Sequence, residues 1–179
     1  FWFALAGAAL SVAGLVITRG RPRKTLVAAI IGTAVGLVSA YIPWSLKQTV
    51  DTLPLIHDIS TDTANPPDLI AAAKLRKPSD HSVTYDGVEV AGLQQKAYPD
   101  LAPLTTSASS EKVFEAAKAA IASMGMKLVD ADPATGRIEA SQTSLLYGFT
   151  DDMVVRIATG ADGTKVDVRS KSRVGRSDL

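Results

Sequence analysis

The chain has 179 residues, of which 46% are hydrophobic, and its 19 basic and 18 acidic residues leave a net charge of +1. This length accommodates one ordinary domain together with membrane helices. The lack of cysteine excludes disulfides, thiol nucleophiles and thiolate metal sites, and the near-zero charge gives no global field for nucleic acid.

Two uncharged apolar runs open the sequence, over 1–18 and 26–46. Each is close to the ~20 residues that a helix needs to cross the hydrocarbon of a bilayer. The loop between them, 19–25, is strongly basic, and such short loops stay on the cytoplasmic side. We therefore predict a transmembrane hairpin over 1–46. It would lie in the inner (cytoplasmic) membrane of a Gram-negative bacterium and leave the rest of the chain in the periplasm.

Aromatic residues mark the ends of both runs, at Trp2 and at Tyr41 and Trp44. In a hairpin they fall at one membrane interface, where such anchors gather. A rival interpretation is a signal peptide, since Val38-Ser39-Ala40 resembles a cleavage site. The uncharged run that precedes it favours the hairpin. The first residue, Phe1, is not methionine, so we expect further residues upstream.

The second run has a small residue at every fourth position, namely Ala28, Gly32, Gly36 and Ala40. Small side chains allow two helix backbones to approach closely in a membrane. The row could pack against the first helix, which is the simpler interpretation, or against another subunit, and both can hold.

Residues 47–106 show little hydrophobic period, and we predict an irregular strap and linker there. Within it we expect a short helix after Asn65 and a small hairpin that turns at Asp86-Gly87. A segment this long without regular elements is commonly functional or wrapped on a partner.

One stretch of the strap, IHDISTDTANPP, holds His57, Asp58 and Asp62. Imidazole and carboxylate groups could bind a metal, but the stretch lacks the rhythm of a calcium loop. Asp and Thr in such runs more often bond to their own backbone in turns. We therefore expect a rigid, self-hydrogen-bonded strap, with no metal, cofactor or catalytic role.

The region 107–179 has the clearest patterns. An apolar stripe predicts a helix from Ser109 or Ser110 to about Met124, with Gly125 as its left-handed cap. Alternation predicts strands near 126–129, 137–141, 153–157 and 166–168. The predicted fold class is α+β, a two-layer domain with an antiparallel sheet of about four strands and one packed helix.

Cations alternate along the last strand, at Arg169, Lys171 and Arg173, with Arg176 beyond it. They share one face, which is either solvated and ion-paired with acids such as Glu139, or a patch for lipid headgroups or an acidic partner.

The adjacent Asp151 and Asp152 point to opposite faces and cannot act as a catalytic pair. We expect one of them to form a salt bridge and the other to cap a turn. The apolar loop SLLYGF, 144–149, either folds over the core or is exposed to a partner or the membrane.

Four stretches together resemble the domain-of-unknown-function family fourteen-ninety-nine of proteobacteria and plastids. They are IHDISTDTANPP (56–67), AYPDLAPL (97–104), DPATGRIEASQTSLLYGFTDD (132–152) and VDVRSKSRVGRSDL (166–179). The resemblance implies transmembrane helices followed by one such domain, and a basic amphipathic helix after Leu179. It implies no activity that can be transferred.

These features favour a non-catalytic accessory or scaffolding subunit of a larger inner-membrane complex. The plastid relatives make a photosynthetic or other energy-converting complex the guess, by analogy. We expect the membrane and other membrane-protein subunits as partners, with lipid headgroups at the cationic patch and no nucleic acid. One alternative is a lipid- or small-hydrophobe-binding module with a cavity between helix and sheet. A second is a hydrolase or metal-dependent enzyme that uses His57 and nearby acids.

Overall fold

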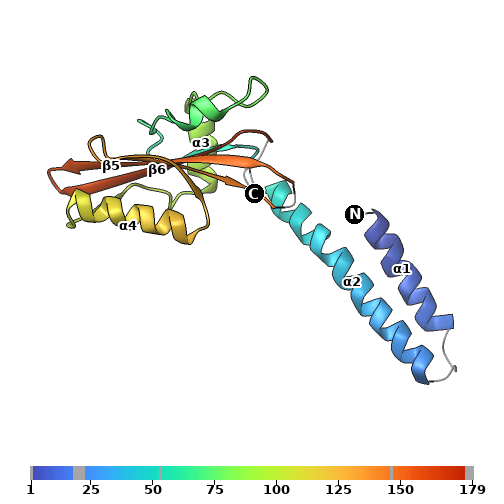
Figure 1. Ribbon diagram of the computed structural model, residues 1–179. Coiled ribbons are helices and arrows are strands. Elements are labelled where there is room, and N and C mark those ends of the chain that lie inside the picture. Colours follow the sequence, from blue (N-terminus) through green and yellow to red (C-terminus); the bar gives the residue numbers. More distant parts are fainter. Residues whose placement is uncertain (1, 18–22, 53, 146, 176–179) are drawn as a thin grey trace. The chain divides into compact units, whose positions relative to one another are not determined.

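The computed structural model describes residues 2–17, 23–52, 54–145 and 147–175. The chain divides into two compact units, 1–53 and 54–179, and each unit is described by itself. The first unit is helical, and the second holds the sheet (Figure 1).

The first unit consists of helices α1 (Trp2–Ile17) and α2 (Arg23–Thr52), which lie side by side (Figure 1). Thr33 is buried between them, and its hydroxyl lies 3.0 Å from the Ser11 carbonyl oxygen of α1 and 2.8 Å from that of Ala29. A hydroxyl that bonds across two helices fixes their register where apolar packing alone would not.

One described helix is long and apolar enough to cross a membrane, over Arg23–Ser45 of α2. Such a helix near the start of a chain is typical of a membrane anchor and also of a signal sequence. The predicted pair of spans is not confirmed, because the 16 described residues of α1 rise only about 24 Å at 1.5 Å per residue. The basic loop falls largely on residues 18–22, which lie outside the described residues.

The predicted small-residue row is divided between two environments. Gly36 and Ala40 are partly covered, whereas Ala28 and Gly32 are exposed. A side chain built on Gly32 would meet no atom within 4 Å. The contact with α1 therefore runs through Thr33, and the first half of the row is left open.

The second unit is built on one antiparallel sheet of six strands. The strands are β1 (Asp58–Ser60), β2 (Leu104–Thr106), β3 (Lys127–Asp132), β4 (Arg137–Thr143), β5 (Thr150–Gly160) and β6 (Gly163–Ser172). Their order is β1-β6-β5-β4-β3, and β2 also pairs with β6. The expected four strands are therefore too few. β1 and β2 have three residues each, and so short a run carries no alternation.

The predicted amphipathic helix is confirmed as α4 (Ser110–Ser123). The Ser109 hydroxyl accepts from the Lys112 amide at its start, and Gly125 follows its end with a φ of 72°. The helix packs on β3, β4 and β5, and its Phe114 and Ile121 are buried in the apolar core. The remaining buried members of this core are Ile138, Ala140, Val155 and Ile157.

The opposite face of the sheet is also covered, which corrects the two-layer prediction. Residues 61–101, which we call the cover segment, contain a 3-10 helix η1 (Ala72–Leu75) and helix α3 (Val88–Ala97). η1 contacts β4, and α3 contacts β1. Figure 1 shows α3 on the side of the sheet away from α4. The hairpin predicted at Asp86-Gly87 is wrong, because Gly87 precedes α3 with a φ of 89°.

Candidate functional site

The sheet face beneath the cover segment is charged. Among the described residues, six ionisable side chains of the second unit are buried there, and we call them the charged layer: Asp58, Glu139, Asp152, Asp167, Arg169 and Lys171. A buried charge is costly unless it is paired and hydrogen-bonded. The partners of these groups therefore decide what the layer can do.

Asp58 on β1 is the acceptor for both buried cations. Its two oxygens accept from Arg169 Nε and Nη2, at 2.8 and 2.9 Å, and the second also accepts from Lys171 Nζ at 3.0 Å. Lys171 also donates to Asp86 at 2.6 Å and to the Thr84 carbonyl at 2.7 Å. Bidentate, charge-assisted bonds of this kind are among the strongest in proteins.

Glu139 on β4 closes the start of η1. Its carboxylate accepts from three successive backbone amides, those of Ile70, Ala71 and Ala72, at 2.8 to 3.0 Å. The Arg137 guanidinium lies 3.1 Å away. The carboxylate therefore satisfies amides that have no partner within the helix itself.

Asp152 on β5 lies at one end of the charged layer, where it is the acceptor for two arginines. It accepts from Arg76 Nε at 2.9 Å, from two nitrogens of Arg173 at 2.8 and 3.0 Å, and from the Ser141 hydroxyl at 2.6 Å. The hydrogen bond to Asp152 raises the pKa of Arg173. The expectation that one of the adjacent aspartates forms a salt bridge is thus confirmed at Asp152, while Asp151 is only half-buried.

Asp62 lies at the opposite end of the layer from Asp152. It accepts from Arg156 at 3.2 Å and from Lys165 at 2.9 Å, and both cations also pair with Asp167. Burial acts to raise the pKa of Asp62, but the bonds from Lys165 and from the Asn65 amide outweigh it and lower the pKa. Asp62 forms the expected turn and also ties the strap to β6.

His57 lies at the edge of the layer, where its ring stacks on that of His81 at 4.0 Å between centroids. Its Nε2 is 3.4 Å from an Asp86 oxygen. Burial lowers the pKa of His57 below its usual 6.5, and His81 and Lys171 lower it further, against the opposite effect of Asp86 and Asp58. The described residues contain no group of three or more metal-type ligands placed to hold an ion.

The cationic row predicted on the last strand does not face solvent. Arg169 and Lys171 are buried on Asp58, and Arg173 is half-buried on Asp152. Arg176 lies outside the described residues. The sharing of one face is confirmed, but exposure of Arg169 and Lys171 is wrong, because the cover segment lies over them and its carbonyls bind them too.

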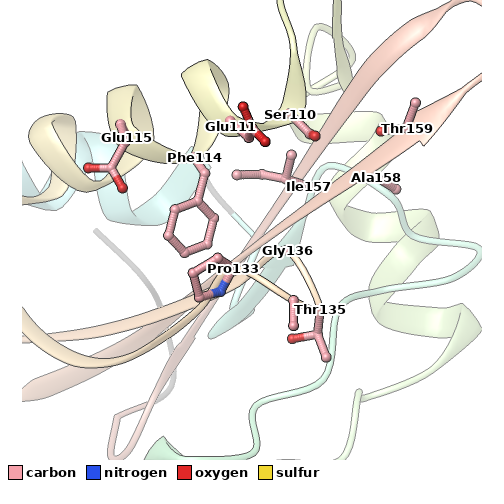
Figure 2. A pocket seen from close by; sticks show the side chains of 11 residues that line it. Ser110, Glu111, Phe114, Glu115, Pro133, Thr135, Gly136, Ile157, Ala158 and Thr159 are labelled. Atoms are coloured by element: carbon pink, nitrogen blue, oxygen red, sulfur yellow. The ribbon is translucent and has the colours of Figure 1, made fainter.

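A cavity of about 450 Å³ opens between α4 and one end of the sheet. Phe114 points from α4 toward Pro133 of the β3–β4 turn, and Ile157 of β5 lies beside them (Figure 2). Glu111 and Glu115 of α4 also line it. An apolar floor with a few polar groups is the ordinary form of a small-molecule site, and this volume falls in the usual range.

Apolar side chains also project at the opposite end of the sheet, from the loop that joins β4 to β5. Leu145 is 98% exposed, Tyr147 76% and Phe149 49%. Of the two alternatives for this loop, the structure shows exposure for these three residues. Leu146 lies outside the described residues.

Sequence reasoning missed several members of this site. Arg76 and Gln94 lie in a region without hydrophobic period, so no pattern singled them out, and Asp86 was noted only as a turn residue. Gln94 is buried, and its side-chain amide exchanges two hydrogen bonds with the Ser60 backbone, at 2.7 and 2.9 Å. It thereby covers the outer edge of β1, which would otherwise be open to another strand.

Fold and site together define an α+β domain, with a charged layer beneath a cover segment, that follows a helix of membrane length. Residues 58–179 match the model of the family described as "Protein of unknown function (DUF1499)", and the chain belongs to this family. The resemblance found in the sequence is thereby confirmed. No curated protein and no solved structure matches the chain.

Proposed function

We propose that the protein is a non-catalytic accessory or scaffolding subunit of a larger inner-membrane complex, with α2 as its anchor and the second unit in the periplasm. The observation that carries this proposal is the open half of the small-residue row. Ala28 and Gly32 lie on a helix of membrane length and are not used in the contact with α1. In a bilayer such a row allows close approach of a second helix.

Two further features support the proposal. Large apolar side chains of α2 are exposed along its length, including Ile31, Val35 and Leu37, which is compatible with lipid or a partner helix but not with water. The charged layer, in turn, has its partners within the domain, so its charges serve to hold the cover segment in place. An energy-converting complex is the candidate assembly, by analogy with the plastid members.

The first experiment is extraction of native membranes in mild detergent, followed by a native gel and mass spectrometry of the band that holds this protein. We expect comigration with a large complex, whose other subunits the spectra would identify. Migration as a lone small species would contradict the proposal.

A pair of matched variants tests the role of the row itself. Ala28→Leu adds bulk to the open row, whereas Ala34→Leu makes the same change at an exposed position on another side of α2. We expect Ala28→Leu to lower the amount of the protein that comigrates with the complex at least severalfold. Ala34→Leu should leave that amount unchanged. Equal behaviour of the two variants would show that the row is not the contact.

A second candidate function is the binding of a small apolar or amphiphilic molecule, which the cavity beside α4 favours. Its floor at Phe114 and Ile157 offers apolar contact, and Glu111 and Glu115 would favour a neutral or cationic head over an anionic one. Binding of this kind is compatible with a subunit of a membrane complex.

The neutral fluorescent probe N-phenyl-1-naphthylamine tests this second function. Thr159 lines the cavity on the same face of β5 as Ile157, so Thr159→Trp would fill it, whereas Ala161→Trp places the same side chain in the exposed β5–β6 turn, which does not line it. We expect saturable probe binding that Thr159→Trp abolishes and Ala161→Trp leaves intact. Lack of saturable binding, or equal binding by both variants, would contradict it.

A further inference from the structure

Hydrogen bonds join the two described ends of the exposed apolar loop, Ser144 on one side and Gly148 and Phe149 on the other. The Ser144 amide donates to the Phe149 carbonyl at 2.7 Å, and the Gly148 amide donates to the Ser144 carbonyl at 3.1 Å. The Phe149 amide donates to the Ser144 hydroxyl at 3.0 Å. Gly148 has a φ of 66°, which a residue with a side chain rarely adopts.

Three apolar side chains of this loop, Leu145, Tyr147 and Phe149, are exposed. Leu145 is almost fully exposed, and the rings of Tyr147 and Phe149 stack on each other at 5.7 Å between centroids. A closed backbone therefore presents one aliphatic and two aromatic side chains outward. Grouped exposure of this kind marks a surface that something covers, since single exposed apolar residues are ordinary but clusters are not.

The loop lies at the end of the sheet where the chain enters the domain. At the end of β6, the Ser172 amide donates to the His57 carbonyl, at 2.9 Å, on one side. On the other side Ser172 is in register with Asp151, and the Arg173 amide donates to Thr150. Strands lie about 4.8 Å apart, so β1 and β5 are roughly 10 Å apart here. The chain enters three residues before His57, at Pro54.

Chain length places this entry close to a bilayer that α2 spans. The apolar span ends at Ser45, and α2 continues to Thr52. Those seven residues rise about 10 Å, and the headgroup region on each side of the hydrocarbon is roughly 5–8 Å thick. Few residues therefore separate the apolar span from the first residue of the domain, and so short a link limits how far from the headgroups the domain can start.

We propose that Leu145, Tyr147 and Phe149 insert into the interface of the bilayer that α2 spans, so that the domain is held on the membrane at a second point. This proposal rests on α2 being the membrane anchor. Leucine, tyrosine and phenylalanine suit the interface, where aromatic rings gather. The short tether favours lipid over a protein partner at this loop.

Fluorescent labels on the full-length chain test the insertion, because the absence of native cysteine allows single-site labelling. The two variants are Leu145→Cys at the loop and Leu104→Cys as the matched control. Leu104 is 62% exposed on β2, which pairs with the opposite end of β6, at Val166. Each carries the same environment-sensitive nitrobenzoxadiazole dye in vesicles of phosphatidylcholine and phosphatidylglycerol.

We expect nitroxide-labelled lipids to quench the dye at position 145 several times more strongly than at 104, and aqueous iodide to show the reverse order. Strong quenching by iodide at both positions would overturn the proposal. Protection of position 145 from both quenchers would also overturn it, because another protein segment would then cover the loop. An alkaline carbonate wash distinguishes failure of the hypothesis that α2 anchors the protein from failure of the hypothesis that the loop inserts. Loss of the protein overturns both the anchor and the insertion, whereas retention with an iodide-quenched dye overturns the insertion alone.

Discussion

Asp58 and Arg169 are 111 residues apart in the chain and form a bidentate ion pair, with 2.8 and 2.9 Å between the bonded atoms. The pair joins the first strand of the domain to the last. Arg169 is further held by the carbonyls of Pro67 and Val83, so the same cation also binds the cover segment. The strand β1, the cover segment and the rest of the sheet are thus parts of one folded unit.

Replacement of Asp58 tests this connection. Asp58→Ala would leave Arg169 and Lys171 buried without their shared counter-charge, and the loss of one partner from a buried pair costs about 3–5 kcal/mol. We expect the free energy of unfolding of the second unit to fall by that amount in a urea titration of the full chain in detergent.

A matched control for Asp58→Ala is Asp130→Ala. Asp130 also pairs with an arginine, Arg137 at 3.1 Å, but its side chain is 39% exposed. Exposed pairs contribute about 0–1 kcal/mol, so we expect little change. Equal losses from the two variants would show that burial of the pair does not govern its contribution.

Glu139 is expected to stabilise the fold through the hydrogen bonds that its carboxylate accepts from backbone amides. Glu139→Gln keeps one acceptor oxygen, whereas Glu139→Ala keeps none and leaves the amides of Ile70, Ala71 and Ala72 unpaired. We expect a loss of about 1–3 kcal/mol for the glutamine variant and a larger one for alanine. Hydrogen exchange of these three amides should accelerate in the same order. Unchanged exchange in Glu139→Ala would contradict the assignment.

Gly136 is expected to tolerate no side chain. It has a φ of 66°, and a Cβ there would press on the Ile157 carbonyl. Gly136→Ala therefore combines backbone strain with a clash, and we expect a loss of about 1–3 kcal/mol in thermal or urea unfolding. Gly125→Ala is the control, because its φ of 72° is similar but the space around it is open. A smaller loss for Gly136→Ala than for Gly125→Ala would contradict this account.

His57 should make the stability of the domain depend on pH. Its pKa is lowered in the folded state from 6.5, so the unfolded chain binds more protons between the folded pKa and about 6.5. Stability should therefore fall as the pH is lowered through this window and level off below the folded pKa. His57→Gln removes this contribution, so unfolding measured from pH 7.5 to pH 5 should vary less than in the wild type. An unchanged pH dependence would contradict the assignment.

Neighbouring residues alone specify the local elements in the second half of the domain. α4, its serine cap and Gly125 were predicted correctly, because cap chemistry and an apolar stripe are set by neighbouring residues. The long strands β4, β5 and β6 were found for the same reason, since alternation over several residues indicates which face is buried. The family was also evident in the sequence, from four motifs in combination.

What covers the charged face of the sheet depends on contacts between segments that are far apart in the chain. Arg169 and Lys171 alternate as solvated residues would, and their burial depends on Asp58 and on carbonyls about 85 to 115 positions away. β1 and β2 likewise exist because β6 offers them backbone partners, not because their three residues favour a strand. Local patterns report the preference of a segment for water or a core. They do not report which distant carboxylate or amide will replace the water, and that replacement formed the charged layer.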